Sequence, residues 1–355
     1  MRRCAALLLA VGATACSHGE PYAFGVEPLS GAHAPGTFTR MTFNAGDDQQ
    51  PAWFPDGASF IYSAQRLDRA DQDRCLAIMP AAGGTISDMV CQRTPGSADS
   101  MEVFESPSPG PDGRVAFLYS SFDLFRLTSY HSRDLYVSGL DSPLVRRSRR
   151  FAYPYQAPGG IEHDGVTRIS WRSPTQFAYV ATLPHYPQPC KFCRPDVATP
   201  VEIVLVDLAG DSASATMVPN TIYATSVAAA GTDTLYYTLL GDSRVFRRVL
   251  SLNHDSVIHD FGTGIIARDV QVLGNRLFAI VGGDVNIELL IGMGWVQNDD
   301  GGEIRILRLD DGSVMAVTGA GRLFRRAALS PDGRLLLAES RGTANDWDIW
   351  RIELP

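Results

Sequence analysis

Two cysteines separated by two residues, Cys190 and Cys193, are the tightest grouping of reactive side chains in the sequence. This spacing suits a thiol–disulfide redox pair, a metal site completed by His185, or a disulfide within a loop. Arg194 stands where covalent haem attachment requires a histidine, and no strand-to-helix pattern surrounds the pair. We therefore expect a structural disulfide, with the redox and metal roles as alternatives.

The histidines show no spacing that would by itself make a metal or catalytic site. Those considered are His131, His163, His185, His254 and His259, and no two of them form a His-x-x-x-His pair. The sequence also lacks the Gly-x-Ser-x-Gly motif of serine hydrolases. We therefore expect no catalytic residue, no metal and no cofactor, although ligands from distant parts of the chain would escape a search by spacing.

The N-terminal residues have the pattern of an export signal. Two arginines precede the apolar run Ala5–Gly12, which is too short to span a bilayer. The segment Ala13–Cys16 then resembles the lipobox of bacterial lipoproteins, which implies cleavage before Cys16 and lipid attachment to it. An ordinary secretory signal, cut at the same bond without the lipid, is the alternative. We expect residues 1–15 to be a signal peptide and residues 16–36 to be a flexible tether.

Export would place the remaining cysteines in an oxidising compartment. Cys75, Cys91, Cys190 and Cys193 are an even set, for which three pairings are possible. We expect Cys75 to pair with Cys91, because the two flank a hairpin turn at Ala82-Gly83-Gly84. Cys190 would then pair with Cys193.

The composition is that of an acidic globular protein. Hydrophobic residues make up 45% and charged residues 20% of the chain, which provides enough apolar side chain for a full core. The formal net charge of -8 argues against a nucleic-acid partner, since a phosphate-binding surface carries a basic excess.

A Pro-Asp-Gly turn between apolar runs recurs along the chain. Its copies are Pro55-Asp56-Gly57, Pro111-Asp112-Gly113 and Pro331-Asp332-Gly333. Proline presets the second position of a type I turn, aspartate accepts backbone N–H groups, and glycine adopts the left-handed conformation that ends the turn. Each copy predicts a tight antiparallel hairpin, and the repetition predicts a repeat protein.

Weaker turns extend this repeat through the middle of the chain. They lie at Ser173, Gly231 and Gly274, so that the sequence divides into six units of short strands without a helical period. The last unit ends one strand short, and Thr37–Phe43 alternates as a strand would. We therefore expect an all-β, six-bladed β-propeller of four-stranded antiparallel blades over residues 37–355, closed into a ring by pairing of the N-terminal strand into the last blade.

Three segments of these units resemble the repeats of TolB-like propellers, also called WD40-like or PD40 repeats. They are Trp53–Gly57, Leu329–Gly333 and the late strand Asp346–Trp350, and a weaker resemblance covers nearly all of residues 37–355. The resemblance implies a propeller that binds a partner or a ligand. The α/β domain that precedes the propeller in TolB has no counterpart between the tether and the first blade. Some similar propellers are lyases that use a histidine-bound metal in the central channel, which implies an enzyme as the alternative.

We expect a non-enzymatic, monomeric scaffold that binds an unknown protein or ligand at the bacterial cell envelope. Lipid would hold it at the outer membrane, facing the periplasm or the cell surface. The alternatives are a metal-dependent lyase or hydrolase acting on glycans or peptides in the central channel, and a propeller that senses a small molecule.

Three segments are candidate contact surfaces. They are the loop Leu183–Pro195, the apolar connection Gly283–Gly301 and the basic run Arg146–Arg150. Gly283–Gly301 would otherwise pack across the propeller face or add a strand, and Arg146–Arg150 would otherwise belong to a solvated outer strand.

Overall fold

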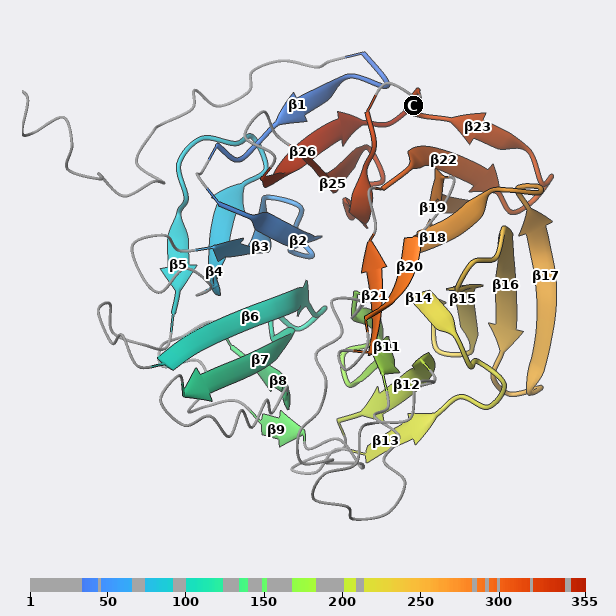
Figure 1. Cartoon of the computed structure of the whole chain (residues 1–355), viewed down its shortest axis with the longest axis horizontal. Coiled ribbons are helices and arrows are strands. Elements are labelled where there is room, and N and C mark those ends of the chain that lie inside the picture. The colour runs from blue at the N-terminus through green and yellow to red at the C-terminus, as the bar shows by residue number, and fades with distance from the viewer. Residues whose placement is uncertain are drawn as a thin grey trace, which may run out of the picture.

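The computed structural model describes residues 34–43, 46–65, 74–91, 100–123, 134–139, 149–151, 168–182, 201–208, 214–282, 286–290, 294–298, 301–319, 322–341 and 346–355. Within these ranges every regular element is a β-strand. The sheets are arranged around a common centre, so that the chain is an all-β propeller of four-stranded antiparallel blades (Figure 1). None of the described residues belongs to a helix long and apolar enough to span a bilayer.

Three four-stranded sheets are formed by strands between residues 170 and 316. One contains β10 (Ser170–Ser173), β11 (Gln176–Thr182), β12 (Val201–Asp207) and β13 (Ser214–Met217). The next contains β14 (Ala224–Ala230), β15 (Thr234–Leu239), β16 (Arg244–Val249) and β17 (His254–Asp260). The third contains β18 (Ile266–Leu273), β19 (Arg276–Gly282), β22 (Glu303–Arg308) and β23 (Val314–Ala316). In each sheet the strands follow the order of the chain, and Figure 1 shows β14 near the centre and β17 at the rim.

A larger sheet in the first half of the chain consists of two meanders. The first contains β2 (Asp48–Trp53), β3 (Ser59–Gln65), β4 (Arg74–Pro80) and β5 (Asp88–Val90). The second contains β6 (Ser100–Pro109), β7 (Val115–Asp123), β8 (Asp134–Ser138) and β9 (Arg149–Phe151). A single parallel bridge between Arg74 and Val103 joins them.

The basic run Arg146–Arg150 ends in β9, the fourth strand of the second meander. Its first residues lie outside the described ranges.

The remaining four-stranded sheet contains both ends of the propeller. It has the order β1 (Phe38–Arg40), β26 (Trp347–Glu353), β25 (Leu335–Arg341) and β24 (Arg325–Leu329). Phe38 lies opposite Ile352, and Arg40 lies opposite Trp350. The N-terminal strand therefore pairs with the last strand of the chain, as the missing strand of the last unit predicts, although it is shorter than Thr37–Phe43.

Asp348 in β26 is an ionisable group buried beside this pairing. Its Oδ1 accepts a hydrogen bond from Arg40 Nη2 at 2.8 Å, and its side chain is 0% exposed. Its Oδ2 is buried and has no hydrogen-bond partner within the described residues. Burial raises the pKa of Asp348 from 3.8 to about 6, although the interaction with Arg40 opposes this shift. The ionised carboxylate therefore makes the folded state less stable at neutral pH.

Replacing Asp348 with asparagine is expected to stabilise the protein at pH 8 by about 1–2 kcal/mol. The folded-state pKa is raised, so this carboxyl lowers stability as the pH rises from about 4 to above 6, and asparagine removes that penalty. Urea unfolding of both proteins at pH 4 and pH 8 measures the effect, and the difference should nearly vanish at pH 4. Asp346→Asn, with the same change of charge, is the control. A destabilised Asp348→Asn protein at pH 8 would contradict this account.

The three Pro-Asp-Gly segments form hairpin turns of one geometry. Gly57, Gly113 and Gly333 have φ values of 68°, 81° and 71°, a left-handed conformation that glycine adopts without strain. Each glycine N–H donates to the carbonyl of the residue three positions earlier, at 2.9 to 3.1 Å. The aspartate carboxylates accept backbone N–H groups, as in the bond from Arg334 N to Asp332 Oδ1 at 3.1 Å. The motif residues are therefore explained by the turns that they form.

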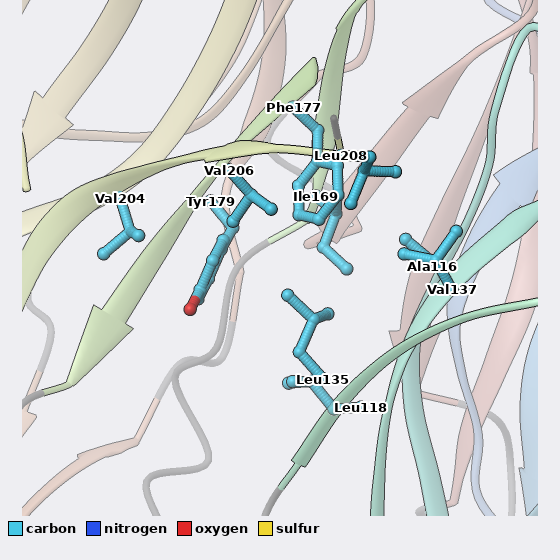
Figure 2. Close-up of a cluster of buried hydrophobic side chains, with 10 residues drawn as sticks. All are labelled: Ala116, Leu118, Leu135, Val137, Ile169, Phe177, Tyr179, Val204, Val206 and Leu208. Carbon is cyan, nitrogen blue, oxygen red and sulfur yellow. The ribbon is translucent and has the colours of Figure 1, made fainter. Parts of the chain in front are cut away.

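Buried apolar side chains fill the spaces between neighbouring sheets. Figure 2 shows one cluster, where side chains from β7 and β8 meet side chains from β11, β12 and the residues next to them. Its members are Ala116, Leu118, Leu135, Val137, Ile169, Phe177, Tyr179, Val204, Val206 and Leu208. Complete burial of a side chain such as Phe177 stabilises the fold by about 1.5–3 kcal/mol. Apolar packing therefore holds the sheets face to face.

A disulfide joins Cys75 at the start of β4 to Cys91 just after β5, with a Cα–Cα distance of 5.0 Å. The hairpin between them turns where the sequence predicts, since Gly83 N donates to Pro80 O at 2.9 Å. This pairing agrees with the predicted connectivity. Cys190, Cys193 and the lipid-attachment candidate Cys16 lie outside the described residues.

Candidate functional site

The three longest connections of the propeller leave its sheets at one end. In an antiparallel meander, the link from the second to the third strand and the link to the next sheet lie at the end where the first strand begins. Residues 152–169, 183–200 and 283–302 are links of these kinds. The Pro-Asp-Gly turns lie at the opposite end. We call these the insertion end and the turn end.

The first strands of four blades carry a β-bulge with an unusual backbone conformation. Gln50, Ser106, Asp269 and Arg326 have φ values of 56°, 48°, 49° and 50°, although none is glycine. Strand pairing shifts register at each of these places. A left-handed residue other than glycine costs on the order of 1 kcal/mol, so an interaction must hold it there.

Hydrogen bonds between sheets supply that interaction. Gln50 N donates to Glu339 Oε1 at 2.5 Å, Ser106 N donates to Gln50 Oε1 at 2.6 Å, and Arg326 N donates to Asp269 Oδ2 at 2.6 Å. In each case the bulge turns a backbone N–H toward a polar side chain of the preceding blade, which for the bond from Ser106 to Gln50 is the first meander of their shared sheet. The strained backbone conformation therefore allows hydrogen bonds between neighbouring blades.

Serine side chains make the corresponding links in the rest of the propeller. Ala229 N donates to Ser170 Oγ at 2.9 Å, and Val270 N donates to Ser226 Oγ at 3.2 Å. Ser108 Oγ donates to Ile169 O at 2.7 Å. Polar contacts therefore lead from each sheet to the next in chain order.

Two tryptophans at equivalent positions repeat this link. Trp53 Nε1 donates to Ala328 O at 3.0 Å, and Trp171 Nε1 donates to Ser108 O at 3.0 Å. Each indole also packs against the apolar cluster between the two sheets that it joins. Trp53 belongs to a Pro-Asp-Gly motif, whereas Trp171 precedes a degenerate turn. The tryptophan is therefore present in both blades, although the turn sequence differs between them.

Polar and charged side chains in or just before the first strands, together with Glu339 near the end of β25, form an axial polar cluster. We define it as Gln49, Gln50, Arg168, Asp269, Arg325, Arg326 and Glu339. Glu339 is fully buried and lies 2.7 Å from Arg325 Nε and 3.6 Å from Arg326 Nη1. Gln49 Oε1 accepts hydrogen bonds from Arg326 Nη1 at 3.3 Å and from Arg74 Nη1 at 2.5 Å. Two arginines therefore neutralise the buried carboxylate.

Arg168 crosses this cluster from the sheet of β10 to two other sheets. Its guanidinium donates to Pro51 O at 2.6 Å, to Arg326 O at 3.5 Å and, through a short contact, to Ala327 O. Burial lowers the pKa of Arg168 to about 10, an effect that the nearby carboxylates of Asp269 and Glu339 partly oppose. Arg168 therefore acts as a cross-brace between the first strands of separate blades.

The C-terminal end of the connection 283–302, which we call its neck, is bound to residues beside the axial polar cluster. Arg268 Nη2 donates to Gly301 O at 2.6 Å, and Gly302 pairs with Phe324 through two backbone hydrogen bonds. A Cβ on Gly301 would lie 2.5 Å from Phe324 O, so only glycine fits this close approach. Beyond the neck, β20 (Asn286–Leu290) and β21 (Gly294–Asn298) form a two-stranded hairpin, which runs across the middle of the view in Figure 1.

The apolar connection Gly283–Gly301 thus forms two strands that pair with each other, where the sequence suggested a packed segment or one added strand. The loop Leu183–Pro195 lies outside the described residues, but the strands that it joins, β11 and β12, place its attachment at the insertion end. These two of the three candidate segments are therefore attached at the same end of the propeller.

Two exposed apolar side chains also lie at the insertion end. Ile222 and Tyr223 precede β14 and are 46% and 47% exposed. Tyr223 has a φ of 69°, and its carbonyl accepts a hydrogen bond from Leu240 N at 2.8 Å. The loop is therefore held in a defined conformation that presents both side chains to solvent.

The described histidines lie far out in the blades. His254 and His259 belong to β17, the last strand of its sheet, and burial lowers the pKa of His259 beside Phe261. His131, His163 and His185 lie outside the described residues. Where side chains are described, no three His, Cys, Asp or Glu residues come together as metal ligands would.

The fold and this site define the chain as a β-propeller with distant structural similarity to TolB-like and WD40 propellers. No protein-family model matches the sequence, and no curated protein matches it. A putative TolB from Agrobacterium tumefaciens is 12% identical, with a TM-score of 0.50 over 90% of this chain and 97% of that chain. The WD40 repeats of RRP9 are 10% identical, with a TM-score of 0.52 over 93% of this chain and 100% of that chain.

An enzyme is among the similar structures as well. Oligogalacturonate lyase from Vibrio parahaemolyticus is 10% identical, with a TM-score of 0.50 over 90% of this chain and 93% of that chain. At these identities the similarity shows the fold alone, because one propeller scaffold carries many functions. The choice among functions must come from the side chains of this chain.

Proposed function

We propose that residues 37–355 form a closed six-bladed ring that acts as a non-enzymatic scaffold and binds a protein or a ligand at the bacterial cell envelope. The proposal includes a signal peptide at residues 1–15, a lipid on Cys16, and a tether at residues 16–36 that holds a monomer at the outer membrane. The observation that carries the binding function is that the three longest connections and the axial polar cluster share the insertion end.

The links between sheets support the closed ring. Side chain–backbone hydrogen bonds join successive first strands, and the bond from Gln50 N to Glu339 Oε1 returns to the sheet that contains both ends of the propeller. Pairing of β1 with β26 covers an edge that would otherwise be open to other strands. Both features favour a propeller whose last blade is completed by its first strand.

The state of the axial carboxylates favours binding over metal chemistry. Glu339 is paired with Arg325 and Arg326, and Asp269 accepts the N–H of Arg326. Arg168 adds a further positive charge beside both carboxylates. A cation entering this cluster would have to displace arginines from their partners, which makes the axis a poor metal site. The alternative, a metal-dependent lyase or hydrolase, would need ligands outside this cluster.

A photo-crosslinking amino acid placed at the two ends of one sheet tests the proposal. Tyr223 lies at the insertion end, and Leu252, which is 72% exposed, lies in the β16–β17 link at the turn end. Each is replaced by p-benzoylphenylalanine in cells that express the full chain. We expect a discrete crosslinked partner from position 223 and none from position 252. The reason is that position 223 lies at the insertion end, where the partner is proposed to bind, and position 252 lies at the turn end of the same sheet.

The opposite pattern, or equal crosslinking from both positions, would contradict use of the insertion end. Metal analysis of the purified protein examines the enzyme alternative. Stoichiometric manganese, zinc or calcium that disappears when His131, His163 or His185 is replaced would refute the non-enzymatic scaffold.

A further inference from the structure

A patch of exposed apolar and basic side chains surrounds the N-terminal strand. We call it the β1 patch and define it as Phe38, Arg40, Phe43, Arg322 and Leu323. Phe38, Phe43 and Leu323 are 43%, 46% and 45% exposed, although each is a large apolar side chain. Side chains of this kind scattered singly need no explanation, but Phe38 and Phe43 each lie beside an arginine side chain, and Leu323 follows Arg322 in the chain.

Aromatic rings and guanidinium groups hold the β1 patch together. Arg322 Cζ lies 3.9 Å from the ring centroid of Trp350 and 5.7 Å from that of Phe38. Arg40 Cζ lies 4.8 Å from the ring centroid of Phe43. Phe38 also packs edge to face against Trp350, with ring centroids 6.0 Å apart. The apolar and basic groups therefore form one surface.

The two arginines differ in how their charge is used. Arg40 is paired with the buried carboxylate of Asp348 at 2.8 Å. Arg322 Nη1 donates to a backbone carbonyl, Arg341 O, at 3.2 Å and otherwise stacks on the two rings. Arg322 also interacts at longer range with the carboxylate of Asp348. It makes no ion pair within the described residues, so its charge can still attract an anionic group that approaches the rings.

This combination has the chemistry of a membrane–water interface. Aromatic side chains concentrate where the headgroups meet the acyl chains, and arginine reaches from an apolar surface to anionic headgroups. Exposed apolar side chains enter the boundary, and each basic residue near an anionic surface contributes about 1 kcal/mol.

The position of the patch in the chain points to the same partner. β1 is the first described strand, and it follows the tether at residues 16–36 proposed above. A flexible segment of this length has an end-to-end distance of roughly 23–27 Å. A lipid on Cys16 would therefore keep β1 closer to the bilayer than the parts of the propeller that lie across the ring from it in Figure 1, such as β12 and β13.

We propose that the β1 patch docks on the anionic phospholipid surface of the membrane to which the chain is tethered. This inference rests on the proposed anchoring, and it goes further because it assigns the residues that orient the propeller. Phe38, Phe43 and Leu323 enter the headgroup boundary, and Arg322 contacts lipid phosphate groups. The anchor supplies attachment, and the patch supplies orientation.

Vesicle binding by the mature chain without its lipid tests the docking separately from the anchor. The chain carries Cys16→Ser, and the vesicles contain phosphatidylethanolamine and phosphatidylglycerol, with phosphatidylcholine vesicles for comparison. We expect the triple variant Phe38→Ser, Phe43→Ser, Leu323→Ser to bind at least about tenfold more weakly. Arg322→Gln should bind anionic vesicles about fivefold more weakly and bind phosphatidylcholine unchanged.

A matched triple variant replaces exposed apolar residues elsewhere, as Leu252→Ser, Val257→Ser, Met315→Ser, and should bind vesicles as the parent does. Thermal unfolding checks that every variant is folded, and Arg322→Gln preserves the test if the loss of Phe38 disturbs the sheet. Equal binding by the parent and both patch variants overturns the inference, as does equal loss in the matched triple variant. Binding to a purified glycan or protein in place of vesicles also overturns it.

Labelled palmitate in cells reports the anchor independently. Incorporation into the parent chain and its loss in Cys16→Ser supports the anchor. If palmitate is incorporated but the unacylated chain does not bind vesicles, the docking inference fails while the proposed anchor stands. If palmitate is absent but the patch variants still lose vesicle binding, the anchor fails and the lipid-binding surface stands.

Discussion

Replacing Arg168 with methionine is expected to lower the free energy of unfolding by about 3–5 kcal/mol. Methionine fills much of the same volume but donates no hydrogen bond, so the carbonyls of Pro51, Arg326 and Ala327 lose a buried donor. The carboxylates of Asp269 and Glu339 also lose a nearby positive charge. Removing the desolvation cost of the guanidinium offsets only part of this loss.

Urea unfolding of the parent and Arg168→Met proteins measures this loss, with Arg308→Met as the control. Arg308 lies in β22 and pairs with Asp310 at the surface, where such pairs contribute about 0–1 kcal/mol. Arg168→Lys should fall between the two, because it keeps the charge but not the branched set of donors. An Arg168→Met protein as stable as the control variant would show that the cross-brace does not hold the blades.

Removing the disulfide between Cys75 and Cys91 is expected to cost about 3 kcal/mol. The bond closes a loop with a sequence separation of 16, and the entropy that it removes from the unfolded chain scales with the length of that loop. The loss should appear in the double variant Cys75→Ser, Cys91→Ser, measured by denaturant unfolding without a reductant.

Dithiothreitol supplies a second measurement of the same bond. It should destabilise the parent protein by a similar amount and leave the double variant nearly unchanged. Cys190→Ser, Cys193→Ser is the comparison, since a bond between these residues would close a much shorter loop and contribute less. If reduction leaves the parent protein equally stable, the disulfide contributes nothing to the fold.

The parts of the fold that depend on local chemistry could be predicted from the sequence. Pro331, Asp332 and Gly333 each have a backbone reason to form a turn, and that reason does not depend on the rest of the chain. Thr37–Phe43 could be assigned to the last blade because the final unit lacked a strand. The pairing of Cys75 with Cys91 followed from a turn between them.

The axial polar cluster could not be predicted in the same way, because its contacts join separate blades. Arg168 has no neighbour in the sequence that marks it, and its partners near Pro51 and Ala327 lie at opposite ends of the chain. A signal existed in the repeat, since Gln50, Ser106 and Arg326 are polar residues at equivalent places before their turns. Aligning the three motif copies on the turn aspartate would have singled them out.

The pairing of β1 with β26 also constrains how the protein can be made. Arg40 and Asp348 are 308 residues apart, and β26 is the last strand of the chain. A nascent chain cannot seat β1 until residues 347–353 have emerged, so this sheet forms after the sheets whose strands lie closer together in the sequence. A product truncated before β26 would leave β1 without its partner and expose a strand edge to other chains and to proteases. The final sheet therefore cannot form in a chain that lacks residues 347–353.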